Sequence, residues 1–396
     1  MDSNCGLSQC NKKIDYAQSH ELDPDYVLGC EPENSLADGN AMESSNNEQL
    51  VSTTRLRALR SAMGTGEKPL LIAIHDYPDP DAIAAAMAMQ TLAGSWGISS
   101  VIAHGGVLGR EENAEMVRLL KIELKTFRTL KSLDAFRGVV FLDTQPMAKN
   151  QSLPLGIPVL AVVDHHSLGD DSVRYTERSS RGTTKLVYSD VRLSVGASST
   201  LMVGYLEAAG IVPDKRLATA LFLGIKTDTD GLLRVSGPDD VHAYTSMMQL
   251  ADLTIASQAI HPPLDISFFQ FLHVAVSGAG IYGATVITNC GDIKSPDMLS
   301  TASDFLIPLR DMRYALAVGF HEGRAFLSLR AKAPHADATR VLLRVVEPEG
   351  KGGGHNLSAG GSIKLDMPPE QCFELIRTRL LEATGDNGNS RKDIIA

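Results

Sequence analysis

The sequence predicts an α/β fold, in which a parallel sheet with helices on both faces is joined by a linker to a smaller α/β domain. Continuous apolar runs occur at 70–74, 139–142 and 159–163, and segments with helical spacing separate them. Such unbroken runs are typical of parallel strands that are buried on both faces. Each run is followed at once by a histidine or an aspartate. Because the carboxyl ends of parallel strands meet at one edge of a sheet, we expect these polar residues to form a single site.

The first fifty residues differ in composition from the rest of the chain. They hold ten of the 47 acidic residues, two of the 37 basic residues and few large apolar side chains, which predicts a disordered acidic segment. The remaining residues are almost neutral, with 37 acids against 35 bases. Cys5, Cys10, Cys30 and His20 also fit a metal knuckle, but they contain no tight cysteine pair, so a flexible segment is favoured.

Composition also excludes several classes of protein. The chain of 396 residues has no dense block of Lys or Arg, so we do not expect it to bind long duplex nucleic acid. Its five cysteines are an odd number without a C-x-x-C pair, which indicates a reducing compartment. Neither a leader peptide nor an apolar stretch that fits a spanning helix is evident, which predicts a cytoplasmic protein without membrane contact.

The same patterns set the expected domain boundaries. The first domain, 51–253, contains a helical pattern from Leu56, an Ala/Met-rich helix over 81–93 and a helix over 239–250. Residues 254–264, with Pro262-Pro263, are expected to be the linker. The second domain, 265–385, is expected to contain helices at 266–277, 336–346 and 369–383, a strand at 284–288 and a hairpin of 314–319 with 324–330, followed by a polar tail at 386–396.

The segment from His75 to Asp81 is the strongest candidate for chemistry. His75, Asp79 and Asp81 lie on a short loop with two prolines and can present three hard metal ligands. The structural alternative makes Asp81 the N-cap of the following helix and Asp79 a turn residue. Asp143 taken alone also fits a cap. The run Asp164-His165-His166 is harder to explain structurally, because adjacent histidines point in different directions, so that one can bind metal while the other faces a substrate.

In this order, these segments resemble the motifs of the DHH phosphoesterase family. A fourth element of the family, an Asp between two threonines, matches Thr227-Asp228-Thr229. The second domain is similar to the DHH-associated substrate domain, in the glycine-rich run from Gly352 to Gly361 and in Ser328-Leu329-Arg330. The resemblance covers residues 65–385 and points to the subgroup of oligoribonucleases and 3′-phosphoadenosine 5′-phosphate phosphatases. Lys351 and Ser358 depart from the usual glycine and alanine, and neither departure removes a ligand.

The resemblance implies a centre with two divalent metal ions. His75 and Asp79 would hold one ion, Asp81, His165 and Asp228 the other, and Asp143 would bridge them. Four clustered carboxylates need cations to offset their repulsion. Oxygen ligands with two imidazoles suit Mn²⁺ best, with Mg²⁺ or Co²⁺ as substitutes. Asp143 and His166 are the expected catalytic residues, and the expected substrate-binding residues are His166, Arg330, Gly352, Gly353, Gly354 and His355.

The function that the resemblance implies is hydrolysis of phosphodiester or phosphomonoester bonds in short nucleotides, by a water activated between two metal ions. Short oligoribonucleotides cleaved exonucleolytically, 3′-phosphoadenosine 5′-phosphate and cyclic or linearised dinucleotides are the expected substrates. Two alternatives stay open: a manganese-dependent pyrophosphatase and a nucleotide-binding regulator without catalysis. The motif at 352–355 argues against the first, and the complete ligand set argues against the second. A homodimer is an open expectation for the assembly.

Overall fold

The computed structural model describes residues 50–146, 148, 150–154, 156–166, 187–234, 237–332, 337–354, 356–386 and 391–395. These residues belong to the second of two units, 49–396. Apart from Leu50, the segment expected to be disordered lies outside the described residues, and so does His355.

A six-stranded parallel sheet forms the centre of the first domain, with the strand order β3-β2-β1-β4-β5-β6. The chain proceeds from β1 to one edge and then from β4 to the other, so the strand order reverses between β1 and β4. Ligands bind at such a switch point in open α/β sheets. The strands are β1 (Leu70–Ala73), β2 (Ser100–His104), β3 (Lys125–Thr126), β4 (Val139–Leu142), β5 (Val159–Asp164) and β6 (Tyr188–Val191). The three predicted apolar runs form β1, β4 and β5.

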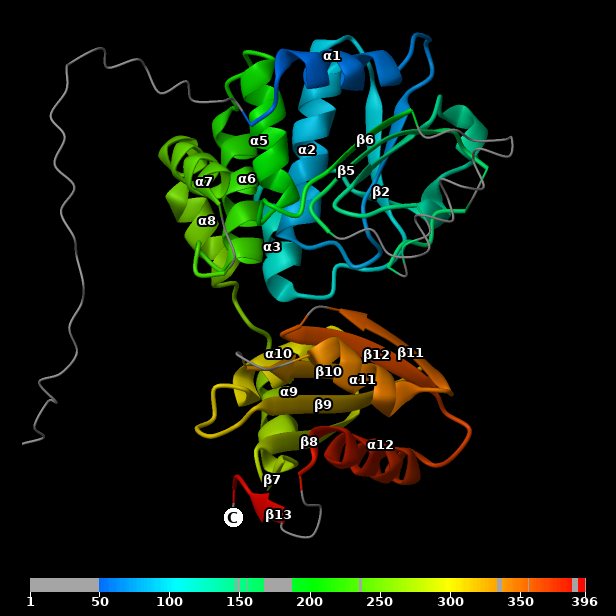
Figure 1. The fold of residues 1–396 in the computed structure, drawn as a ribbon, viewed down its shortest axis with the longest axis vertical. Coiled ribbons are helices and arrows are strands. Elements are labelled where there is room, and N and C mark those ends of the chain that lie inside the picture. Colours follow the sequence, from blue (N-terminus) through cyan, green and yellow to red (C-terminus); the bar gives the residue numbers. More distant parts are fainter. Residues whose placement is uncertain are drawn as a thin grey trace, which may run out of the picture. The chain divides into compact units, whose positions relative to one another are not determined.

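The two faces of this sheet are covered differently. Leu70, Ile72 and Ile74 pack into a core with the α-helices, which lie together on one side in Figure 1. Leu71 and Ala73 point to the opposite face, where the short 3₁₀ helices η1 (Phe127–Thr129) and η2 (Leu133–Ala135) contribute to the cover. The helices are α1 (Thr53–Ala62), α2 (Pro80–Ser95), α3 (Glu111–Leu119), α5 (Ser198–Ala208), α6 (Lys215–Thr229), α7 (Pro238–Leu250) and α8 (Leu253–Ile260).

Helix α8 shortens the linker that was predicted over 254–264. Asp252 caps this helix by accepting hydrogen bonds from the backbone amides of Thr254 and Ile255. Ala256 and Ala259 are buried in the core of the first domain, which holds the helix in place. The connection to the second domain therefore begins only after Ile260 and ends at Asp265, the N-cap of α9.

The second domain is a seven-stranded mixed sheet with the order β11-β12-β10-β9-β8-β7-β13. Its strands pair antiparallel except β8 with β9. Helices α11 and α12 cover one face, and α9 and α10 cover the other. The elements are α9 (Ile266–Ser277), β7 (Gly280–Tyr282), β8 (Thr285–Asp292), α10 (Met298–Leu306), β9 (Tyr314–His321), β10 (Arg324–Ala331), α11 (Ala338–Val346), β11 (Gly350–Gly354), β12 (Ser358–Lys364), α12 (Pro369–Thr384) and β13 (Arg391–Asp393).

The predicted hairpin is present as β9 and β10, which turn at His321-Glu322-Gly323. The polar tail differs from the expectation, because Arg391–Asp393 form β13 and pair with β7. This backbone pairing requires no apolar side chains, so composition did not indicate it. Within the described part of the chain, no helix combines the length and the apolar character that crossing a membrane would require.

Candidate metal centre

The carboxyl ends of three adjacent strands bring the predicted ligands together. His75 lies just beyond β1, Asp143 follows β4, and His165 follows β5. Asp79 and Asp81 come from the start of α2, and Asp228 lies in the last turn of α6. The ligands thus gather beside the point where the strand order reverses.

These six side chains, together with His166, form three overlapping groups that can hold a metal ion. Within each group, one potential ligand atom of every residue lies within 4.8 Å of the others. The groups are His75, Asp79 and Asp143; Asp81, His165 and Asp228; and Asp143, His165 and His166. The first two groups contain the same residues as the two ion sites that the family resemblance implies.

Asp143 lies between the two ion sites and turns one carboxylate oxygen to each of them. Its Oδ2 is 3.6 Å from Nε2 of His75, and its Oδ1 is 3.4 Å from Nε2 of His165. Its backbone has φ 57°, in the left-handed region that few residues other than glycine adopt. Uncommon backbone conformations of this kind cluster at functional sites. The geometry therefore suits a carboxylate that bridges two cations.

The electrostatics of the centre reflect crowding of buried carboxylates. Burial and the neighbouring carboxylates of Asp143 and Asp228 raise the pKa of Asp81 well above its usual value. Burial and Asp79 raise the pKa of Asp228 to about 6. Burial also opposes ionisation of Asp143, but His165 and His75 outweigh it and hold its pKa well below the usual value. Divalent cations are the expected means of keeping all these carboxylates ionised together.

His165 provides an independent test of whether a cation fits. Its Nε2 is buried and makes no hydrogen bond, one of three such side-chain atoms among the described residues. Oxygens of Asp228 and Asp143 lie 3.1 and 3.4 Å away, yet neither is aligned to accept a proton from it. Burial would lower the pKa of His165, but these carboxylates raise it to about 12. A buried nitrogen without a hydrogen bond, surrounded by carboxylate oxygens, fits a metal ligand.

The start of α2 shows which aspartate is the helix cap. Asp79 is the N-cap, and its Oδ1 accepts a hydrogen bond from the backbone amide of Ala82 at 3.0 Å. The structural alternative, which assigned the cap to Asp81, is therefore wrong. Asp81 lies in the first turn with its side chain fully buried. Asp79 both caps the helix and lies close to the candidate ligand His75, with its Oδ1 3.7 Å from His75 Nε2.

Asp164 orients the two histidines that follow it. Its Oδ1 accepts hydrogen bonds from the backbone amides of His165 and His166, at 2.8 and 3.1 Å, and lies 2.8 Å from His166 Nδ1. Its Oδ2 accepts a hydrogen bond from the side-chain amide of Gln145 at 2.8 Å. Burial would lower the pKa of His166, but the contact with Asp164 raises it above the usual value. Sequence reasoning missed Gln145, whose only signal was its place two residues after Asp143.

Of the predicted substrate-binding residues of the second domain, the four that the structure describes lie on β10 and β11. Gly352, Gly353 and Gly354 belong to β11, an edge strand of the sheet. A Cβ at Gly354 would lie 2.3 Å from the carbonyl oxygen of Ser358, so a side chain is excluded there. Arg330 lies on β10, with Nε 2.5 Å from Oδ1 of Asp304 and Nη2 3.3 Å from Oδ2. Its two-nitrogen edge therefore binds a carboxylate of the protein itself.

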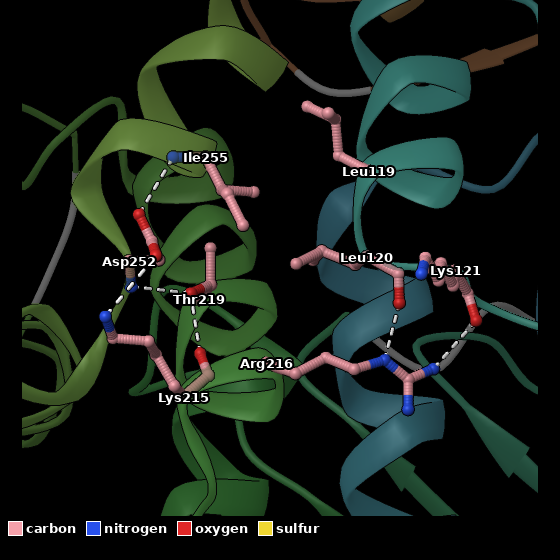
Figure 2. Close-up of a pocket in the computed structure, with 8 residues that line it drawn as sticks. All are labelled: Leu119, Leu120, Lys121, Lys215, Arg216, Thr219, Asp252 and Ile255. Carbon is pink, nitrogen blue, oxygen red and sulfur yellow. Dashed lines mark hydrogen bonds and ion pairs between the residues drawn. The ribbon is translucent and has the colours of Figure 1, made fainter.

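A pocket of about 400 Å³, drawn in Figure 2, lies apart from these residues, between α3, α6 and α8. Arg216 in its wall donates to the backbone oxygens of Leu120 and Lys121, and Lys215 lies 3.4 Å from Asp252. Both cations thus already have partners. None of the predicted site residues lines this pocket, which comprises Leu119, Leu120, Lys121, Lys215, Arg216, Thr219, Asp252 and Ile255.

Comparisons with known proteins agree with this architecture. No family model matches the chain. An uncharacterized protein of Methanocaldococcus jannaschii is 31% identical over 328 residues, which cover 80% of this chain and 64% of that protein. A probable manganese-dependent inorganic pyrophosphatase of Clostridium acetobutylicum is 24% identical over 163 residues, which cover 41% of this chain and 48% of that protein. The chain thus matches less than two thirds of either relative.

Among solved structures, an exopolyphosphatase-related protein of Bacteroides fragilis has a similar fold. The TM-score is 0.66 at 12% sequence identity, and the match covers 84% of this chain and 97% of the other. This likeness extends over both sheets and independently supports the predicted fold class. The chain therefore shares the fold of this protein, and its His/Asp cluster gathers the side chains that the sequence motifs marked as candidate ligands.

Proposed function

We propose that the protein is a metal-dependent phosphoesterase that hydrolyses phosphodiester or phosphomonoester bonds in short nucleotides. The observation that carries the proposal is the pair of ligand groups joined by Asp143, whose two oxygens face His75 and His165 separately. His75 and Asp79 would hold one divalent cation, and Asp81, His165 and Asp228 the other, with Mn²⁺ best suited to these ligands. The chemistry that such a pair supplies when bound is activation of water and stabilisation of charge on phosphate oxygens.

The remaining tasks belong to groups that do not hold metal. Although burial opposes it, the contact with Asp164 raises the pKa of His166 and favours the protonated imidazole, which can donate to a phosphate oxygen. Arg330 would supply a second cationic donor from the second domain. Residues 51–396 carry little net charge, which suits a short substrate held by a few groups better than a long strand held along a basic surface.

Inorganic pyrophosphate is a second candidate substrate. The clostridial relative carries that activity in its name, and its match covers 41% of this chain. Short nucleotides are preferred because Arg330 and the glycine strand β11 provide cationic and backbone groups on a second domain, where a nucleotide can extend beyond its reacting phosphate.

A substrate panel with Mn²⁺, resolved by product chromatography, tests the proposal. The panel compares dinucleotides, longer oligoribonucleotides, cyclic dinucleotides, 3′-phosphoadenosine 5′-phosphate and pyrophosphate, with a metal-free sample as the control. We expect release of nucleoside monophosphates or of phosphate from at least one short nucleotide, and none without metal. Hydrolysis of pyrophosphate alone would favour the second candidate. Binding of nucleotide without turnover by metal-loaded protein would contradict catalysis and favour a regulatory protein.

A further inference from the structure

We propose that Ser198, at the start of α5, is a positioning residue that aims the carboxylates of Asp81 and Asp143 at the cations. This inference rests on the proposed metal centre and extends it to a residue outside the ligand set. Ser198 is fully buried, and its hydroxyl donates to Oδ1 of Asp143 at 2.9 Å. That oxygen is the one that faces His165. An ionised carboxylate oxygen has two acceptor positions, so the serine fixes its direction and leaves the other position for a cation.

The backbone at the same place fixes Asp81. The amide of Ser198 donates to Oδ2 of Asp81 at 2.7 Å, and the amide of Ser199 donates to Oδ1 at 2.8 Å. One amide for each oxygen locks the plane of the carboxylate. Ser198 therefore contacts a ligand of the second ion site and the carboxylate shared by both sites.

The first backbone amides of helix α5 are available to bond Asp81 because the helix has no cap of its own. Its N-cap is Ala197, which has no side-chain oxygen, and its first turn contains no acidic residue. The first amides of a helix have no partner within the helix and need an acceptor from elsewhere. Asp81, from α2, supplies that acceptor across the domain. The same contact completes the helix and holds a metal ligand, with the positive end of the helix dipole toward the carboxylate.

A second buried aspartate holds the start of α5 in place. Oδ2 of Asp240 accepts the amides of Gly196 and Gly237 at 2.9 and 2.8 Å. Its Oδ1 accepts the hydroxyl of Thr200 at 2.6 Å. Asp240 is fully buried near the start of α7. Asp240 thus links Gly196 and Thr200, which flank Ser198, to helix α7. These hydrogen bonds hold the backbone around Ser198 in place.

The test compares Mn²⁺ binding by metal-free wild-type and variant proteins, measured by isothermal titration calorimetry. Ser198→Ala removes the hydroxyl and keeps both amides. We expect it to weaken Mn²⁺ binding roughly 10- to 100-fold, the usual effect of losing a group that orients a metal ligand. Ser198→Thr keeps the hydroxyl and should recover most of the affinity. Ser303→Ala is the control, because Ser303 is also fully buried and hydrogen-bonded but lies on α10 of the second domain, which contributes none of the candidate ligands.

The outcomes separate this inference from the proposed function. Wild-type protein that binds two Mn²⁺ while Ser198→Ala loses no more affinity than Ser303→Ala would overturn the role of Ser198 alone. Wild-type protein that binds no Mn²⁺ would overturn the metal centre and this inference with it. If Ser198→Ala does not fold, Ser198→Cys replaces it, because a thiol of similar size is a weak donor. Wild-type affinity in that variant would equally refute the role of the hydroxyl.

Discussion

Replacing Arg330 by alanine tests whether the second domain contributes to substrate binding as proposed, separately from the metal centre. The guanidinium is largely buried and already has several partners. Nε and Nη2 contact Asp304, and Nη1 donates to Oγ of Ser328 at 3.2 Å and to the carbonyl of Leu329 at 3.4 Å. Of its five N–H groups, these contacts leave one, on Nη2, for a phosphate oxygen while Asp304 stays bound.

The expected loss of kcat/KM in Arg330→Ala follows from the one N–H group that remains for the substrate. A hydrogen bond to a charged group contributes about 1.5–3 kcal/mol. Since about 1.4 kcal/mol corresponds to a factor of ten, Arg330→Ala should lower kcat/KM for a dinucleotide roughly 10- to 150-fold. Arg330→Lys should recover only part of this loss, because an ammonium cannot contact both oxygens of Asp304 and a phosphate in the same geometry. A larger loss would indicate that Asp304 releases the guanidinium when substrate binds.

Steady-state kinetics on two substrates provides the assay. In the proposed function a dinucleotide contacts both the metal centre and Arg330, whereas a small chromogenic phosphodiester depends mainly on the metal centre. Arg330→Ala should therefore impair the dinucleotide more and leave the bound Mn²⁺ unchanged. Arg324→Ala is the matched control, because Arg324 lies on the same strand and donates to Ser362. Equal losses on both substrates, or loss of bound metal, would refute a role for Arg330 in substrate binding.

Three further changes test the centre and its support. Asp143→Ala should bind fewer than two Mn²⁺ by elemental analysis and abolish hydrolysis; two bound ions with a near-normal rate would exclude the bridging role. Gly224→Ala should lower the free energy of unfolding, measured by urea titration, by about 1–3 kcal/mol, because the new Cβ would lie 2.5 Å from Ser199 Oγ. Gly94→Ala is the control: its Cβ would enter open space, so the free energy of unfolding should rise slightly. Asp190→Ala should lower the free energy of unfolding by about 3–5 kcal/mol, since the buried carboxylate binds Arg192 and two further donors.

The contribution of Asp190 to the free energy of unfolding should depend on pH, in a direction set by the pKa of its carboxyl group. Burial would raise the pKa of Asp190, but Arg192 and Tyr205 outweigh it and hold the pKa below the usual value. The wild-type advantage over Asp190→Ala is therefore present above about pH 4, the usual pKa of an unfolded aspartate, and declines as the pH falls through the folded-state pKa. An advantage that grows below pH 4 would contradict the assignment.

Much of the architecture could be predicted because the strands that carry the ligands are unbroken apolar runs. Leu70–Ala73 and Val139–Leu142 are buried along their whole length, and each leads directly to a predicted ligand. The cap of α2 could not be predicted in the same way. Asp79 and Asp81 both fit an N-cap by residue type, and only the position of the first helical turn decides between them. Helix α8 was missed because Pro262-Pro263 dominated the pattern, although Asp252 marks its start.

The site residues that could not be predicted depend on contacts between distant parts of the chain. Ser198 lies 117 positions from Asp81 and 55 from Asp143, and its neighbours form an ordinary small-residue helix. No local pattern could connect it with the metal ligands. The same holds for Asp304, which contacts Arg330 only because α10 packs against β10. Sequence reasoning therefore found the candidate ligands, which stand in local motifs, and missed Ser198, Gln145 and Asp304, whose contacts depend on the fold.

The number of Mn²⁺ ions that the metal-free protein binds tests the central claim most directly. An Mn²⁺ titration followed by electron paramagnetic resonance counts the ions and detects coupling between them. The arrangement of His75 and His165 on either side of Asp143 predicts two ions for each chain, with a signal altered by their proximity. One ion for each chain, or two that behave independently, would contradict a shared two-metal centre.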